Sequence, residues 1–198
     1  MPPVNVPPLE VEILSNVASK GSKKVSESLS KLSKEVVEVS SVAAKIASIK
    51  MISEEISIDD NKAIISYAQM ISGIDGMALL TIPREEALTL VDLLNGSEVG
   101  STGVFMDIDR SAIKETLNIL SNSFLTILAE ELNADFMIGS PRMVPTTSIK
   151  ELLEKVSEAD NGEAVFFNTS LKISKHQVRA QLYIIFSDKL ANLLKEIK

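Results

Sequence analysis

The order of secondary-structure elements predicted from the sequence occurs twice along the chain. A long helix, a strand, a hairpin and a closing helix are predicted in residues 9–96 and again in residues 104–198. A shift of 102 or 103 residues superposes three pairs of identical residues: Asn16 on Asn118, Ile82 on Ile185 and Leu90 on Leu193. Two such halves most simply pair their hairpins in one central sheet, with the long helices across it. We therefore predict an α/β (α+β) fold with an internal pseudo-twofold duplication, forming a single domain over residues 9–198.

Apolar spacing and turn residues define the elements of the first half. They are a helix at 9–33, a strand at 36–42, a hairpin of strands at 63–72 and 77–82, and a helix at 84–94. Because glycine weakens a helix interior, Gly21 predicts that the first helix is bent or in two pieces. Pro83 suits the start of the last helix and Asn95-Gly96 its end. The alanine-rich piece up to Met51 has no clear pattern.

The second half repeats this order around a central helix within residues 106–132. The other predicted elements are a short strand at 103–108, a strand at 134–138, a helix at 148–156, a hairpin of strands at 164–173 and 177–186, and a helix at 188–197. Asp107 or Asp109 is predicted to cap the central helix, because a carboxylate there bonds free backbone amides. Pro141 and Pro145 bound a predicted turn, and residues 160–162 form a predicted break.

The central helix places three polar residues on one face. Ser111, Glu115 and Asn118 return to one stripe, since a helix advances about 100° per residue. Apolar residues at helical spacing mark the opposite face: Ile113, Leu117, Leu120, Phe124, Ile127 and Leu128. A rigid element thus presents a carboxylate and an amide to solvent together.

From Ser111 the sequence reads Ser-x3-Glu-x2-Asn, followed by 22 residues and then Pro141. This pattern resembles the signature of the CheC/CheX/FliY chemotaxis phosphatases. The surrounding sequence, MDIDRSAIKETLNILSNSFLTILAEEL, is similar to the central helix of that family. The resemblance covers residues 9–198 and is closest to CheC. It implies a phosphatase (a hydrolase) that removes the aspartyl phosphate of a CheY-type response regulator, and the absence of cysteine and of a long apolar run in the sequence leads us to expect a cytoplasmic protein.

The resemblance also implies roles for the four residues of the motif. Asn118 would position the attacking water, a task that suits an amide because it bonds water and does not ionise. Glu115 would anchor the helix by pairing with a lysine of the receiver, since a carboxylate aimed at a phosphoryl group repels it. Ser111 would contact the partner or the backbone, and Pro141 would fix a supporting turn. The chain would need no cofactor of its own, and Mg²⁺ would be bound by the receiver.

The first helix carries a degenerate copy of the motif. Asn16 occupies the asparagine position, but Leu9, Ile13 and Val39 stand at the serine, glutamate and proline positions. Glu12 lies four residues before Asn16 and shares its face, although the shift of one residue turns the carboxylate by about 100°. Asn16 and Glu12 are therefore a possible second site, and the alternative is a structural or partner-binding helix.

Composition excludes several other classes of function. The net charge of −7 and the pI of about 4.9 argue against a nucleic-acid partner, which attracts basic surfaces. The sequence has no cysteine, and no apolar run is long enough to insert in a membrane. Residues 1–8 hold four of the seven prolines and are predicted to be a flexible arm. His176 has no metal-binding neighbours in sequence, so no metal site is predicted.

Two alternatives to the phosphatase remain open. CheC-like proteins also associate with the receptor deamidase CheD, so the chain would then act as an adaptor or regulator with weak or no catalysis. FliM and FliY middle domains share the fold, which would make the chain a structural part of the flagellar switch. The intact Glu115 and Asn118 pair favours the phosphatase.

Overall fold

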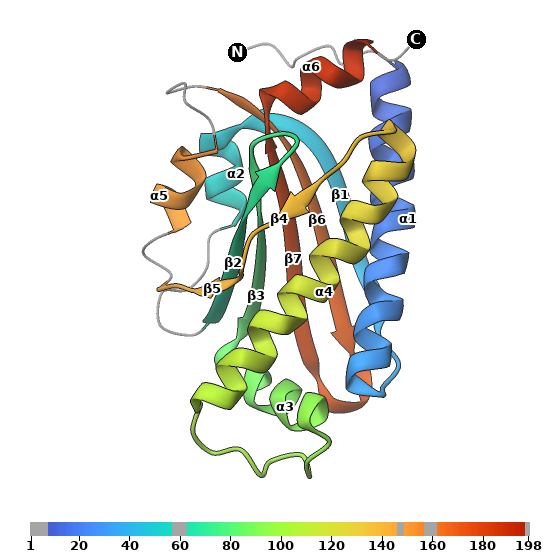
Figure 1. Ribbon diagram of the computed structural model, residues 1–198. Coiled ribbons are helices and arrows are strands. Elements are labelled where there is room, and N and C mark those ends of the chain that lie inside the picture. The colour runs from blue at the N-terminus through green and yellow to red at the C-terminus, as the bar shows by residue number, and fades with distance from the viewer. Residues whose placement is uncertain (1–7, 57–62, 146–148, 157–161, 197–198) are drawn as a thin grey trace.

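A computed structural model describes residues 8–56, 63–145, 149–156 and 162–196 (Figure 1). The helices of these residues are α1 (Pro8–Ser33), α2 (Ile49–Glu55), α3 (Arg84–Asn95), α4 (Asp107–Leu132), α5 (Ile149–Glu154) and α6 (Asp188–Glu196). The strands are β1 (Glu38–Ser48), β2 (Ala63–Ser72), β3 (Gly76–Pro83), β4 (Met137–Ile138), β5 (Arg142–Met143), β6 (Glu163–Ile173) and β7 (Val178–Ser187).

One antiparallel sheet joins both halves of the chain. Its strand order is β1-β6-β7-β3-β2-β4, and β5 also pairs with β2. The two halves of the chain contribute corresponding strands, namely β1 and β4, β2 and β6, and β3 and β7. Exchanging the members of each pair reverses the strand order and leaves it otherwise unchanged, as expected for a pseudo-twofold arrangement. The two hairpins meet at the centre, where Leu80 of β3 lies opposite Leu182 of β7. The predicted duplicated α/β fold with paired hairpins is therefore confirmed.

The two faces of the sheet carry separate hydrophobic clusters, because alternate residues of a strand point to opposite faces. Leu80 and Ile82 of β3 belong to the cluster under α1 and α4, whereas Met77 and Leu79 belong to the cluster under α2 and α5. Figure 1 shows the long helices α1 and α4 across one face and the short helices α2 and α5 on the other. Strand β3 and residues 182–187 of β7 are consequently buried on both faces, whereas Arg179 and Gln181 of β7 are exposed.

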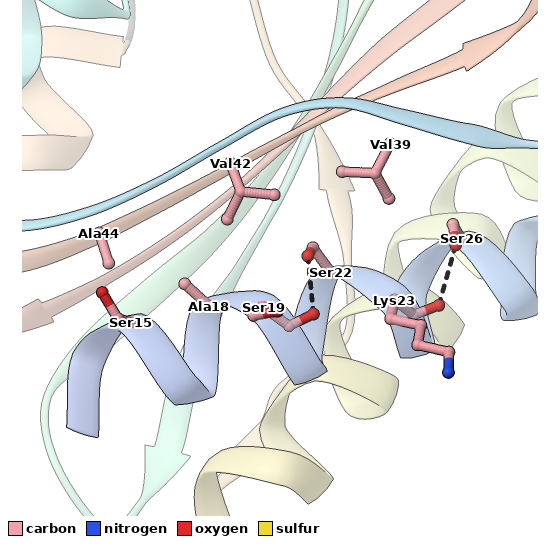
Figure 2. A pocket seen from close by; sticks show the side chains of 9 residues that line it. All are labelled: Ser15, Ala18, Ser19, Ser22, Lys23, Ser26, Val39, Val42 and Ala44. Atoms are coloured by element: carbon pink, nitrogen blue, oxygen red, sulfur yellow. Dashed lines mark hydrogen bonds between the residues drawn. The ribbon is translucent and has the colours of Figure 1, made fainter. Parts of the chain in front are cut away.

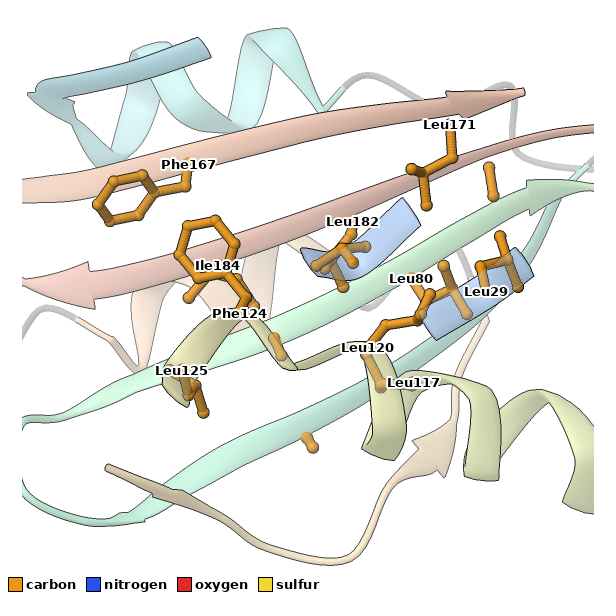
Figure 3. Packing of buried hydrophobic residues seen from close by; sticks show 14 of the residues in the cluster. Leu29, Leu80, Leu117, Leu120, Phe124, Leu125, Phe167, Leu171, Leu182 and Ile184 are labelled. Atoms are coloured by element: carbon orange, nitrogen blue, oxygen red, sulfur yellow. The ribbon is translucent and has the colours of Figure 1, made fainter. Parts of the chain in front are cut away.

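The helices α1 and α4 lie side by side and antiparallel over the sheet. Ser28 bonds Ser123 across the pair (2.7 Å), and near the other end Lys20 bonds Glu131 (3.2 Å). Figure 3 shows Phe124 and the leucines of α4 pointing toward the strands. The ring of Phe124 is only 1% exposed, and its centroid lies 5.1 Å from that of Phe167 on β6. This packing fixes α4 on the sheet and leaves its polar stripe on the outside.

The first helix is a single element of 26 residues, so the predicted division into two pieces at Gly21 is wrong. Gly21 is buried against Phe124, and a Cβ atom at this position would lie 2.6 Å from two ring carbons. The glycine is therefore explained by the close approach of α1 to the Phe124 ring. Sequence spacing alone could not distinguish this role from a helix break.

Replacing Gly21 with alanine is expected to destabilise the protein. An extra methyl group in a packed core costs about 1–3 kcal/mol, and the better helix propensity of alanine returns at most about 1 kcal/mol. Urea denaturation measures the net loss in the free energy of unfolding. Gly103→Ala is the matched control, because a Cβ there meets nothing within 4 Å. Equal midpoints for the two variants would contradict the tight contact with Phe124.

The remaining differences from the prediction lie at the edges of the sheet. The strand predicted at 103–108 is wrong, because residues 103–106 form a loop and α4 begins at Asp107. Strand β1 runs on to Ser48, and α2 occupies the piece around Met51 for which no element was predicted. Of the strand predicted at 134–138, only Met137–Ile138 form a strand, β4. The break at 160–162 lies almost wholly outside the described residues, as does the arm 1–8 except for Pro8, which begins α1.

Candidate functional site

The candidate site begins where α4 does. Asp109 lies in the first turn, and its Oδ2 accepts a hydrogen bond from the backbone N–H of Met106 (2.8 Å). This satisfies a backbone amide that the helix leaves unpaired. The predicted capping role is thus confirmed for Asp109, whereas Asp107 is exposed and lies 3.9 Å from Arg110. The cap fixes the first residue of the helix and hence the phase of the stripe that follows.

The loop before α4 is held by a buried carboxylate of α3. Asp92 accepts hydrogen bonds from Gly100 N (2.7 Å), Ser101 Oγ (2.9 Å) and Thr102 N (3.1 Å). Burial alone raises the pKa of Asp92, but these hydrogen bonds outweigh it and leave the pKa below its usual value. This stabilisation is therefore fully present above the ordinary pKa of an aspartate and is lost as the pH falls from that value through the lowered pKa of Asp92.

The three predicted residues of the stripe lie together on the outer face of α4. Ser111 and Glu115 are exposed and Asn118 is half-buried. Ser111 Oγ donates to Asp107 O (3.0 Å), a bond within the helix itself. Among the described residues, Glu115 has no ion-pair partner and its carboxylate faces solvent. The structure thus presents an unpaired carboxylate and an amide from one rigid helix.

The stripe contains one further residue, Asn122, which was not predicted from the sequence. Its Nδ2 donates to the backbone oxygen of Asn118 (2.9 Å) and to Asn118 Oδ1 (3.1 Å). Residues four apart on a helix face each other, so the spacing from Asn118 was the available signal. The stripe therefore extends over Ser111, Glu115, Asn118 and Asn122.

Pro141 lies in the short connection between β4 and β5 and not in a turn. It separates β4 from β5, and both pair with the same strand, β2. Gly139 N and Val144 N still bond backbone oxygens of β2 (2.8 and 3.1 Å). Proline cannot donate such a bond, so Pro141 interrupts an edge strand. The turn predicted between Pro141 and Pro145 is wrong, because β5 occupies part of it.

The structure places Asn16 in the contact between α1 and α4. Its side-chain Nδ2 donates to Glu131 Oε1 of α4, and Lys20 bonds the other oxygen of the same carboxylate. Glu12 is exposed and, in the described part of the chain, makes no hydrogen bond with Asn16. Asn16 therefore forms a hydrogen bond with a glutamate of α4. This contact supports the alternative in which the first helix has a structural role and carries no second site.

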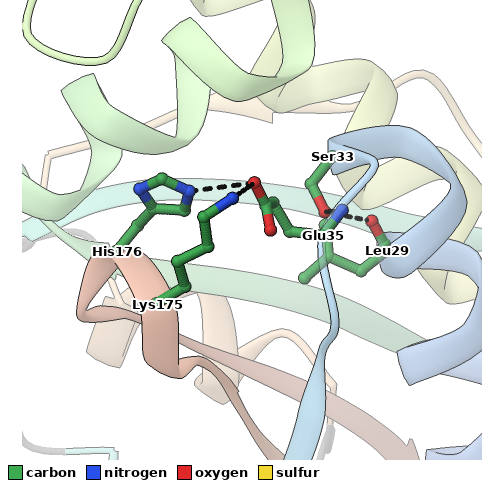
Figure 4. A network of polar contacts seen from close by, with 5 residues as sticks. All are labelled: Leu29, Ser33, Glu35, Lys175 and His176. Carbon is green, nitrogen blue, oxygen red and sulfur yellow. Dashed lines mark hydrogen bonds and ion pairs between the residues drawn. The ribbon is translucent and has the colours of Figure 1, made fainter.

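His176 belongs to a second polar cluster, at the turn between β6 and β7. Its Nε2 lies 3.0 Å from Glu35 Oε1, and Lys175 Nζ donates to the same oxygen (2.7 Å; Figure 4). The hydrogen bond from Lys175, followed by that from His176, lowers the pKa of Glu35. The cluster ties this turn to the connection between α1 and β1. Within the described ranges, no group of three or more acidic, histidine or cysteine side chains is arranged to hold a metal ion.

A groove of about 490 Å³ lies between α1 and β1, away from the stripe on α4 (Figure 2). Serines of α1 and the apolar side chains of Val39 and Val42 line it. The hydroxyls of Ser22 and Ser26 donate to backbone oxygens of their own helix (3.0 and 2.9 Å). The groove therefore contains no carboxylate or amide that matches the predicted chemistry. No helix of the described residues is both long and apolar enough to cross a membrane.

Comparison with known proteins reveals similarity in structure only. No protein-family model matches the sequence, and no curated protein matches it at a significant level. The structure of FliY from Thermotoga maritima superposes with a TM-score of 0.72 at 16% identity, covering 98% of this chain and 97% of that one. The FliM middle domain from H. pylori gives a TM-score of 0.64 at 14% identity, with coverage of 97% and 100%.

A third similar structure is a complex. CheX from Borrelia burgdorferi, solved together with CheY, BeF3 and Mg²⁺, superposes with a TM-score of 0.53 at 17% identity, covering 89% of this chain and 97% of that one. At such identities the likeness concerns the fold. The resemblance inferred from the motif is thereby confirmed at the level of fold: this chain has the fold that CheX, FliY and the FliM middle domain share.

Proposed function

We propose that this protein is a phosphatase that accelerates hydrolysis of the aspartyl phosphate on a CheY-type receiver domain. The observation that carries the proposal is the stripe on α4, where Glu115 and Asn118 face outward from a helix fixed by its cap and its packing. The similarity to a CheX that was solved with CheY supports the choice of partner.

The proposed reaction requires few chemical groups from this protein. Water attacks the phosphorus atom, the bond from phosphorus to the aspartate oxygen breaks, and the aspartate leaves as a carboxylate. The protons of the water remain with the inorganic phosphate or pass to solvent. Positioning and electrostatics account for most of the catalysis in phosphoryl transfer. Asn118 would hold the attacking water in line with the phosphorus, using an amide that stays neutral at every working pH.

Glu115 would hold the two proteins in register. It stands one turn before Asn118 and is exposed, so it can reach a cationic side chain of the receiver. Direct contact with the phosphoryl group is unfavourable because both are negative. Mg²⁺ would come with the receiver and neutralise charge on the phosphoryl oxygens. We expect this chain to contribute no ligand to that ion.

The proposal is tested by the decay of a phosphorylated CheY-type receiver in buffer with Mg²⁺, with and without this protein. Acceleration that saturates with protein concentration supports it. A decay rate that the protein does not change at any concentration contradicts it.

The similarity to FliM middle domains favours a second candidate, a non-catalytic component of the flagellar switch. In that case the α4 stripe would serve binding alone. Association with a CheD-type deamidase is a further proposal of the same non-catalytic kind. A chain that binds its partner in a pull-down but leaves the phosphorylated receiver unchanged would support these candidates over the phosphatase.

Exposed apolar side chains adjoin the N-terminal end of the stripe. Val104 is 76% exposed, Met106 is 65% exposed and Ile108 is 67% exposed. Ile108 is three residues before Ser111 and so lies on the same helical face. A receiver that covers Glu115 and Asn118 would also cover these side chains, because they continue the same surface. We therefore include them in the proposed docking surface.

Replacing Ile108 with aspartate is expected to weaken docking without changing the chemistry. Loss of one buried apolar contact and burial of a charge should raise the half-saturating concentration by about tenfold, which corresponds to about 1.4 kcal/mol. The maximal rate should stay at the wild-type value, because Asn118 is untouched. A titration of this protein against phosphorylated receiver separates the two quantities. Asp107→Ala, at the exposed neighbouring position, controls for changes in local charge.

A further inference from the structure

The amide of Asn118 is held by a neighbour that the motif does not include. Asn122 Nδ2 lies 2.9 Å from the backbone oxygen of Asn118 and 3.1 Å from its side-chain Oδ1. Asn122 is exposed and lies one turn further along α4. Its side chain contributes nothing to the hydrophobic core, so these two contacts are its structural role.

The two contacts together fix the orientation of both amides. A backbone carbonyl only accepts hydrogen bonds, so the group of Asn122 that faces it must be the NH2 end. The same nitrogen faces the side chain of Asn118, which must therefore present its oxygen. The NH2 end of Asn118 is turned away from Asn122, and the described residues supply it with no acceptor. Asn118 thus keeps both N–H donors available to a binding partner and one lone pair of Oδ1 unused.

This orientation suits the chemistry of a phosphoryl site. An outward NH2 end directs positive partial charge toward an anionic group, and an outward oxygen would direct negative charge toward it. One N–H can donate to the oxygen of the attacking water and leave another lone pair of that oxygen for the phosphorus. The orientation exists before a partner binds, so the complex does not have to select it from two rotamers.

We propose that Asn122 is a positioning residue, which holds Oδ1 of Asn118 and so presents the NH2 end of Asn118 to the phosphoryl site of the partner. The proposal rests on the phosphatase function proposed above. It goes beyond the Ser-Glu-Asn-Pro motif because it assigns a role to a residue outside it and states which end of the catalytic amide faces the substrate.

Three variants test the consequence for the rate. Asn122→Ala removes both hydrogen bonds to Asn118, including the one that holds Oδ1, so the maximal rate should fall by about fivefold while the half-saturating concentration stays unchanged. Asn122→Asp should lower the rate further, because a carboxylate accepts from Nδ2 of Asn118 and turns its oxygen outward. Thr126→Ala removes the hydroxyl that donates to Asn122 O (2.8 Å), keeps both amide contacts and should retain the wild-type rate. Alanine is the better helix former, so loss of fold would not explain a fall in Asn122→Ala.

How firmly the side-chain amide of Asn118 is held can be measured without any phosphatase assay. In protein labelled with ¹⁵N at asparagine, the order parameter of the Asn118 side-chain amide reports how firmly it is held. We expect a high value in the wild-type protein and in Thr126→Ala, and a clear drop in Asn122→Ala. Equal order parameters in wild type and Asn122→Ala would overturn the proposal, as would equal maximal rates.

The two measurements also separate this proposal from the proposed function. If the wild-type protein accelerates no dephosphorylation while the order parameter drops in Asn122→Ala, the phosphatase function fails and the role of Asn122 in orienting Asn118 stands. If the wild-type protein is active and Asn122→Ala matches it in both rate and order parameter, the function stands and the role of Asn122 fails.

Discussion

Asn118→Ala is expected to lower the maximal rate of receiver dephosphorylation by about a hundredfold, because positioned reactants lose about this much when the geometry is lost. The side chain is half-buried and belongs to neither hydrophobic cluster, so the fold should persist. The measurement is a titration of phosphorylated receiver decay with increasing variant. The variant should still bind the receiver, since Glu115 remains available as the anchor.

Two further variants make this expectation specific. Asn16→Ala is the matched substitution in the other half of the chain, and it should leave the rate unchanged because Asn16 bonds Glu131 inside the helix pair. Glu115→Ala should raise the half-saturating concentration more than it lowers the maximal rate. A fall in rate with Asn16→Ala, or a wild-type rate with Asn118→Ala, would show that the site lies elsewhere.

Phe124→Ala is expected to cost about 3–5 kcal/mol of the free energy of unfolding, the usual loss for a buried phenylalanine. The ring is almost fully buried, packs against Phe167 of the sheet and fills the space left by Gly21 of α1. Its removal leaves a cavity at the junction of both long helices with β6. Chemical denaturation with a fitted free energy of unfolding measures the loss.

Phe124→Leu keeps more of the apolar volume and should lose less stability than the alanine variant. It should also make room for a methyl group at position 21. In Phe124→Leu, Gly21→Ala is therefore expected to be less harmful than in the wild-type protein, which a double-mutant cycle detects. Additive losses from the two substitutions would contradict a direct contact between Gly21 and Phe124.

Patterns of neighbouring residues in the sequence correctly predicted those helices and strands that depend mainly on their own residues. The central helix follows from its apolar spacing and its cap at Asp109, and the hairpins follow from two apolar strands joined by short turns. The duplicated order also predicted that the two hairpins pair in one central sheet, and the structure shows that β3 and β7 are the strands that meet there. These features depend on neighbours in sequence, and so a single sequence reveals them.

Features that depend on distant parts of the chain were not predictable in this way. Gly21 is a packing residue only because Phe124 stands opposite it, about a hundred residues away. Pro141 interrupts an edge strand because β4 and β5 both pair with β2. A pattern at one position cannot reveal the residue that packs against it, and both positions were therefore misinterpreted as local breaks or turns.

In the candidate site, too, some features follow from neighbouring residues and others from the packing of distant parts of the chain. Ser111, Glu115 and Asn118 share a helical face that the sequence predicts, and the structure places them there. The engagement of Asn16 by Glu131 depends on how α1 packs on α4, so the sequence left the first-helix copy open. Asn122 is a local neighbour of Asn118, but only the geometry of its two hydrogen bonds shows which end of each amide faces outward.

The central claim is that Asn118 on α4 supplies the catalysis of a receiver phosphatase. It is tested most directly by the decay of a phosphorylated CheY-type receiver in Mg²⁺ at saturating concentrations of wild type, Asn118→Ala and Asn16→Ala, compared with the receiver alone. We predict rapid decay with wild type and Asn16→Ala, and decay close to that of the receiver alone with Asn118→Ala. Decay that is equally slow with wild type and without it, or equally fast with Asn118→Ala and wild type, would contradict the claim.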